Sequence, residues 1–180
     1  MLLSISGDID YRYGGTGEEY RSWITPLDDL SQDEAMQTFE KLTGVRMGEA
    51  VTVPVMQGRT LTCRNAVKGV GCFSFSELCE RALGAADYIA VSQHFHHVVL
   101  TGIPEFTIAD RDLMRRFILL IDELYNRKVK LCCTARTGVN SLFRGQTSEF
   151  DEVFAFDRTV SRLNEMQTKE YRELPHLSDL

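Results

Sequence analysis

The stretch HVVLTGIPEFTIADRDLMRRFILLIDELYNRKVKLCCT, residues 97–134, decides the fold class. It begins with a short apolar run at 97–101, which predicts a buried strand, and it closes with a second apolar run at 129–134. Between them, residues 110–127 carry apolar side chains at helical spacing, which predicts a long amphipathic helix. The stripe of that helix consists of Leu113, Phe117, Leu120, Ile121 and Leu124. Strand, helix and strand in this order predict a βαβ crossover with parallel strands.

The regions on either side of this unit extend the same α/β pattern. Ser31-Gln32-Asp33-Glu34 is typical of a helix N-cap, and Gly44 is a suitable end for that helix. Val51–Met56 and Thr60–Cys63 predict two strands around a turn, with Pro54 on an edge strand because proline cannot donate to a ladder. Further elements are predicted as short strands at 2–6 and 70–75, a helix at 77–82 with Ser76 as its cap, a helix at 85–95, and a last helix from about Asp157 to Glu173. Two regions are expected: residues 1–48, a linker and helical segment, and residues 49–180, an α/β region.

Composition and charge restrict the class of protein. The chain has 180 residues, 43% hydrophobic and 26% charged, which is typical of a globular domain. A net charge of −6 gives no indication of a basic nucleic-acid-binding face, so no nucleic-acid partner is expected. No apolar run approaches the roughly 20 residues that span a bilayer. The five cysteines show no regular spacing, which disfavours a secreted disulfide framework.

Two segments resemble parts of a nucleotide site but lack its chemistry. Gly14–Glu19 resembles a phosphate-binding loop, yet acidic residues stand where a lysine must reach the phosphates, and no G-x-x-x-x-G-K-[ST] occurs in the sequence. Leu119–Glu123 resembles a Walker B strand, which holds Mg²⁺ through its aspartate. The helical spacing around it predicts a helix instead, with Asp122 and Glu123 on the solvated side near Arg115, Arg116 and Arg127. We therefore expect no ATP hydrolysis by this chain unaided.

Two other clusters have alternative interpretations. The run His94-Phe95-His96-His97 could belong to a metal-dependent enzyme, but the paired spacings that zinc sites use are missing, so no metal is expected. Cys132 and Cys133 are adjacent in a predicted strand and point to opposite faces. On the last helix, Arg158, Arg162 and Glu165 share one face. They form either a surface ion-pair network or cations that are presented to a phosphate or a partner chain.

Several motifs together resemble the C-terminal half of the AFG-like ATPases, a family of AAA+ P-loop ATPases. The motifs are FSFSELC (73–79), LGAADY (83–88), FHHVVLTGIP (95–104), RRFI (115–118), LIDELY (120–125) and FAFDRTVSRLNEMQ (154–167). The resemblance covers residues 58–172 in order, and Asp10-Tyr11-Arg12 matches a segment that follows the family's nucleotide-binding core. The Walker A and Walker B segments of the family precede that segment, so the chain resembles a member without its catalytic half.

The resemblance implies a function for the intact protein. Family members couple ATP binding and hydrolysis, with Mg²⁺, to protein handling, which in mitochondria means protein quality control. It implies a partial AAA+ architecture, protein clients, neighbouring ATPase subunits and a mitochondrial location. It also makes Arg158 and Arg162 candidates for cations that sense the nucleotide γ-phosphate. The alternative is a stand-alone interaction module that binds a family ATPase or its clients.

Overall fold

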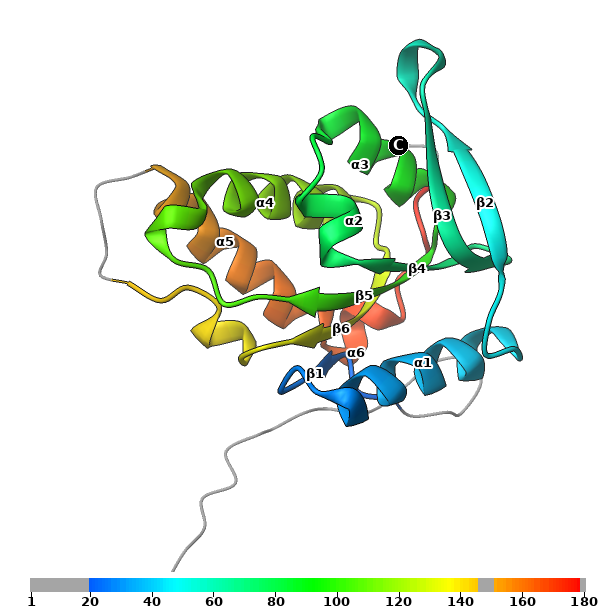
Figure 1. Ribbon diagram of the computed structural model, residues 1–180, viewed down its shortest axis with the longest axis horizontal. Coiled ribbons are helices and arrows are strands. Elements are labelled where there is room, and N and C mark those ends of the chain that lie inside the picture. The colour runs from blue at the N-terminus through cyan, green and yellow to red at the C-terminus, as the bar shows by residue number, and fades with distance from the viewer. Residues whose placement is uncertain (1–19, 146–150, 179–180) are drawn as a thin grey trace, which may run out of the picture.

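The computed structural model describes residues 20–145 and 151–178, which form one mixed sheet covered by helices on both faces (Figure 1). The strands are β1 (Trp23–Ile24), β2 (Glu49–Pro54), β3 (Thr60–Val67), β4 (Val70–Ser74), β5 (His97–Ile103) and β6 (Lys130–Ala135). The helices are α1 (Asp29–Thr43), α2 (Phe75–Cys79), α3 (Ala85–His94), α4 (Arg111–Asn126), α5 (Asp151–Met166) and α6 (Lys169–Arg172). Short 3₁₀ turns lie at Met56–Gly58, Ile108–Asp110 and Val139–Ser141. The expected strand at 2–6, the loop at Gly14–Gly17 and the Asp10–Arg12 motif lie outside the described residues.

The predicted βαβ unit is confirmed. The sheet has six strands in the order β1-β6-β5-β4-β3-β2, and β5 pairs with β6 in parallel, with Val98 opposite Leu131. Strand β4 is also parallel to β5, and β1 is parallel to β6, whereas β3 is antiparallel to both of its neighbours, β2 and β4. Pro54 lies on β2, the edge strand that the sequence predicted. Strand β1 and helix α1 show that residues before position 49 contribute to this same sheet.

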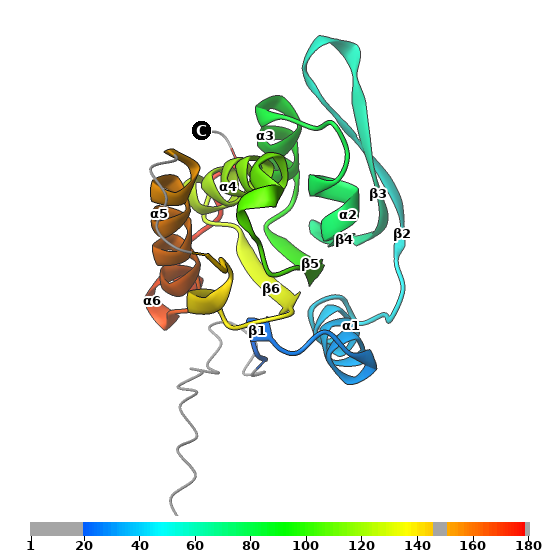
Figure 2. The same ribbon diagram turned by 60° about the vertical axis from the view of Figure 1, so that its left-hand side comes forward.

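The two faces of the sheet carry separate apolar cores because successive strand residues point in opposite directions. Cys132 packs with Ile24 and Phe39 in the smaller core under α1, whereas Cys133 lies in the larger core. Both thiols are buried, as the alternating pattern predicted. The larger core includes buried residues of α3, α4 and α5, and Figure 2 shows these helices and α1 on opposite sides of the strands.

Three helix ends differ from the sequence-based expectation, each because another side chain caps the helix. Asp28, not Ser31, caps α1, since its carboxylate accepts from the Ser31 amide at 2.8 Å. Ser74, not Ser76, caps α2 in a reciprocal capping box with Glu77. The C-terminal helix is divided, because Thr168 adopts an extended backbone and caps the separate helix α6. Gly44 ends α1 in the left-handed conformation, as predicted.

Among the described residues, no helix is long and apolar enough to span a bilayer.

Candidate functional site

Arg158 and Arg162 lie on the side of α5 that faces α4. On the same helix, Phe156, Leu163 and Met166 are buried and pack into the larger core. Residues four positions apart share one helix face, so the two guanidinium groups project side by side. Helix packing therefore places both predicted cations on one surface, next to the last turns of α4.

Asp122 of α4 is the common counter-ion of the two arginines. Arg162 Nη1 donates to Asp122 Oδ1, and Arg158 Nη2 donates to Asp122 Oδ2 at 3.4 Å. The side chains of Asp122 and Arg162 are only 19% and 23% exposed, whereas that of Arg158 is 58% exposed. Because the pair with Arg162 is partly shielded from water, it is the stronger of the two.

This pairing corrects part of the sequence-based prediction. Asp122 was expected on the solvated side of α4 near Arg115, Arg116 and Arg127, but it faces α5 instead. Arg116 reaches the Cys79 carbonyl at 3.1 Å, and Arg115 lies 3.9 Å from Asp112. The prediction that Leu119–Glu123 forms a helix, not a Walker B strand, is confirmed by α4.

Tyr125 extends the cluster along the same helix pair. The Arg162 guanidinium lies 4.8 Å from the centre of the Tyr125 ring, a cation–π distance. The Tyr125 hydroxyl donates to Glu165 Oε2 at 2.7 Å, and this bond to a carboxylate raises the pKa of Tyr125. We call the five residues Asp122, Tyr125, Arg158, Arg162 and Glu165 the α4–α5 charge cluster. Its formal charges cancel, and Arg158 is the member that presents the most guanidinium surface to solvent.

What the α4–α5 charge cluster can do chemically follows from its groups. A guanidinium donates two parallel hydrogen bonds to a phosphate as readily as to a carboxylate. A phosphate that approaches Arg158 and Arg162 would therefore compete with Asp122 for the same N–H groups. The chemistry that the cluster offers is therefore the pairing of guanidinium groups with negative charge.

The histidine run joins the end of α3 to the start of β5, where His97 is the register partner of Lys130 on β6. His96 Nδ1 and His97 Nδ1 are 2.7 Å apart and share a hydrogen bond, and His96 Nε2 lies 3.0 Å from the Lys68 carbonyl. Both ring nitrogens of His96 are thus engaged by protein groups. Within residues 20–145 and 151–178, no three His, Cys, Asp or Glu side chains converge as a metal site would require.

The free energy of unfolding is expected to fall in acid because of His97. Burial, with the charges of His96 and Lys130, lowers the pKa of His97 to about 3, against an ordinary value of 6.5. In the unfolded chain His97 therefore takes up a proton near pH 6.5, whereas in the folded chain it stays neutral until the pH falls to about 3. Stability is lost as pH falls through this window, with a slope of up to about 1.4 kcal/mol per pH unit.

Chemical denaturation at about pH 7, 6 and 5 measures this slope. The His97→Gln variant should show a shallower pH dependence than the parent chain. His94→Gln is the matched control, since His94 is exposed on the same segment, and it should keep the parental slope. Equal slopes in all three proteins would contradict the assignment to His97.

The described cysteines offer little nucleophilic chemistry. All five are free, and burial raises the pKa of Cys72, Cys79 and Cys132 to about 12. A thiol with so high a pKa is almost entirely protonated at neutral pH. These residues therefore fill space between elements.

Comparison with known proteins identifies the family. The model of the AFG1-like ATPases matches residues 1–174. The chain belongs to this family. The AFG1-like match includes the motif that carries Arg158 and Arg162 and the LIDELY segment that carries Asp122.

Individual AFG1-like relatives are similar along nearly the whole chain. Cell division protein ZapE of Escherichia coli K12 is 32% identical over 177 residues, which are 98% of this chain and 46% of the relative. Lactation elevated protein 1 homolog B of Danio rerio is 29% identical over 200 aligned residues, which cover 94% of this chain and 40% of the relative. The chain thus spans about half the length of these curated relatives. No solved structure matches it.

Sequence reasoning found the two arginines but missed their partner. Arg162 and Asp122 are 40 positions apart, and the helix period alone does not say which face of α4 meets α5. Tyr125 and Glu165 are likewise separated by 40 positions. Only the packing of α5 on α4 brings these residues together.

Proposed function

We propose that this chain acts as the C-terminal portion of an AFG1-like AAA+ ATPase. The family match over residues 1–174, together with the 46% share of ZapE that the chain covers, carries this proposal. The sequence holds no phosphate-binding lysine motif, so ATP and Mg²⁺ would bind residues supplied by the other portion of the intact protein. Residues 49–180 would form its C-terminal α/β region, with 1–48 as the segment that follows the ATPase core.

Arg158 and Arg162 would act on the nucleotide within this assembly. The support for this is that both guanidinium groups donate to one carboxylate, that of Asp122. A γ-phosphate presented in cis or by a neighbouring subunit offers the same geometry with more negative charge. An arginine in that position stabilises the charge that develops during phosphoryl transfer.

The cellular role follows from the family only. We propose that the intact protein couples ATP hydrolysis to mitochondrial protein quality control, with proteins as clients. The names cell division protein ZapE and lactation elevated protein 1 homolog B describe those relatives. The proposal for this chain rests on its membership of the AFG1-like family.

A second function, a stand-alone interaction module, is favoured by one observation. The described residues already form a six-stranded sheet with a core on each face, so they bury their own apolar surface. A domain with its own core is able to fold and bind alone. In this case the chain would bind a family ATPase or its clients without hydrolysing ATP.

A chimeric ATPase tests the first proposal. The segment of E. coli ZapE that matches this chain is replaced by residues 1–180, and ATP hydrolysis by the purified chimera is compared with that of ZapE. If this chain is a working C-terminal portion, the chimera should hydrolyse ATP within about tenfold of the parent. A chimera that folds and binds ATP but does not hydrolyse it would contradict the proposal and favour the interaction module.

A further inference from the structure

A cleft of about 420 Å³ opens where the parallel strands end at their carboxyl side. The ends of β4, β5 and β6 contribute its floor, and the segment between β1 and α1 forms one wall. Its lining residues are Leu27, Asp28, Asp29, Gln32, Ser74, Phe75, Ser76, Glu80, Thr101, Gly102 and Thr134. This cleft does not involve the α4–α5 charge cluster.

The topology explains why the sheet opens here. Strand β1 leads into α1 on one face of the sheet, whereas β5 leads into α4 on the other face. The chain therefore leaves the carboxyl ends of these two strands in opposite directions (Figure 2). Ligands of open α/β sheets bind in the crevice that such a divergence creates. The pairing of β5 with β6 also shifts register between Leu100 and Ile103.

Gly102 lies at this irregularity and adopts a positive φ of 83°. Its amide donates to the Thr134 hydroxyl oxygen at 2.9 Å instead of to a backbone carbonyl of β6. The ladder between the two strands is therefore interrupted at Gly102 and resumes at Ile103, and a Cβ at Gly102 would meet no other atom within 4 Å. Bulges of this kind are common beside binding sites, where they change the direction in which a side chain points.

The charges of the cleft favour a cation. Asp28, Asp29 and Glu80 lie at the rim, and none of the described lining residues is basic. The hydrogen bond from the Ser31 amide lowers the pKa of Asp28, so this carboxylate is ionised at neutral pH. An anionic ligand such as a phosphate would be repelled, whereas an ammonium or guanidinium group would be attracted.

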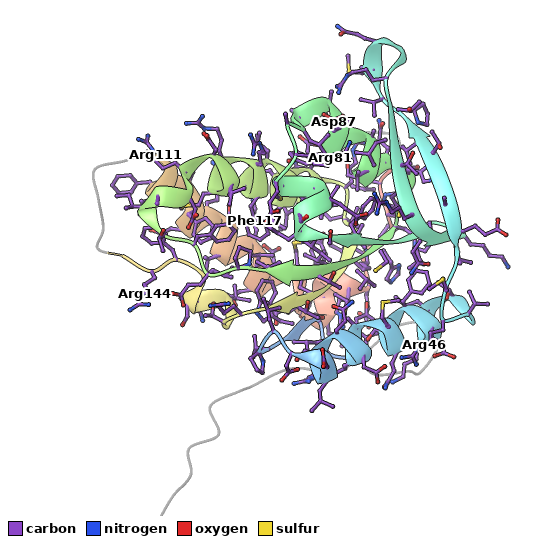
Figure 3. All side chains as sticks on the ribbon, viewed as in Figure 1. Arg46, Arg81, Asp87, Arg111, Phe117 and Arg144 are labelled. Carbon is purple, nitrogen blue, oxygen red and sulfur yellow. The ribbon has the colours of Figure 1, made fainter. Side chains whose placement is uncertain are left out.

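The shape of the cleft favours a chain over a small amine. A second hollow of about 730 Å³ adjoins it and shares Ser74, Ser76 and Glu80, so the two form one groove. The second hollow also contains Arg64 on β3, which lies 3.6 Å from Glu77, and Arg81 (labelled in Figure 3), so the acidic part of the groove is the cleft with Asp28, Asp29 and Glu80. Apolar surface accompanies the charge: Leu27 in the wall is 38% exposed and the neighbouring Leu30 is 82% exposed, whereas Phe75 beneath the floor is buried. Such a groove fits an extended segment that alternates basic and apolar side chains.

We propose that this groove binds a basic, extended peptide segment of a protein client. The identification of the peptide as part of a client rests on the proposed function, whereas the binding itself requires only the groove. Asp29 and Glu80 would pair with basic side chains at the rim, and Leu27 would contact apolar ones. Rim charges of this kind contribute mainly to association rate and to salt dependence.

Fluorescence anisotropy with the purified chain, without ATP, tests the groove. The probe is a short fluorescein-labelled peptide in which arginine alternates with leucine, and the comparison peptide has glutamate in place of arginine. We expect saturable binding of the arginine peptide, weaker binding at higher salt, and no binding of the glutamate peptide. The double variant Asp29→Asn/Glu80→Gln should bind the arginine peptide about tenfold more weakly.

Asp112→Asn is the matched control. Asp112 also lies in the first turn of a helix, α4, so its loss costs a similar helix-dipole interaction while the groove keeps its charge. It should bind like the parent chain, and all variants must first show parental circular dichroism spectra. Equal weakening by Asp112→Asn, equal binding of both peptides, or no binding by the folded parent would each overturn the proposal. Because the assay needs no ATP, its outcome is independent of hydrolysis by the chimera.

Discussion

Replacing Phe117 by alanine is expected to lower the free energy of unfolding by about 3–5 kcal/mol. Phe117 is fully buried on α4 and faces the sheet (Figure 3). Its ring centre lies 5.3 Å from that of Phe106 and 6.0 Å from that of Phe75, and Phe156 of α5 completes the group at 6.3 Å. Truncation would leave a cavity that these rigid rings cannot fill.

Urea denaturation followed by circular dichroism measures this loss. Phe154→Ala is the matched control, because Phe154 is 66% exposed on α5 and its truncation removes the same atoms from the surface. It should change the free energy of unfolding by no more than about 0.5 kcal/mol. A loss below about 1 kcal/mol in Phe117→Ala would mean that α4 does not pack on the sheet through this ring.

The double variant Arg158→Ala/Arg162→Ala is expected to slow ATP hydrolysis by the ZapE chimera at least about a hundredfold. An arginine that reaches the transferring phosphate raises the hydrolysis rate by about 10³–10⁵. Because both arginines are removed, the loss should appear whichever of the two reaches the phosphate. The effect should appear in the turnover rate more than in the affinity for ATP, because the charge that these groups stabilise develops in the transition state. Steady-state hydrolysis as a function of ATP concentration separates the two quantities.

Asp122→Asn distinguishes a phosphate-binding role from a structural one. This variant weakens the same ion pairs between α4 and α5 but leaves both guanidinium groups in place. Hydrolysis should therefore persist in Asp122→Asn and be lost in the double arginine variant. If both variants lose hydrolysis to the same extent, the arginines hold the helices together and do not act on the nucleotide. Unchanged hydrolysis in the double variant would remove them as sensors.

The regular elements could be predicted from the sequence because their signals are local. The apolar stripe of α4 and the two apolar runs beside it define the βαβ unit without any knowledge of the rest of the chain. Helix ends were less certain, since Asp28 competed with Ser31, and Ser74 with Ser76, as capping residues three and two positions apart. Thr168 divided the last helix in the same way. In each case a side chain that hydrogen-bonds to nearby amides decided the boundary.

The long-range features could not be predicted. Strand β1 has two residues, too few for any alternating pattern, and it is a strand only because β6 offers a free edge. The groove combines the start of α1 with residues at the carboxyl ends of β4, β5 and β6. The pairing of Asp122 with Arg158 and Arg162 depends on the rotation of α5 against α4. These contacts are set by tertiary packing, and no local period of the sequence records them.

We propose that this chain contributes groups to an ATPase, and its sequence holds no phosphate-binding loop motif. ATP hydrolysis by the purified chain is therefore measured with Mg²⁺, after circular dichroism has shown the chain to be folded. We predict no phosphate release above that of buffer, while the ZapE chimera measured in parallel is active. Hydrolysis by the chain alone that saturates with ATP and disappears in Arg162→Ala would contradict the account.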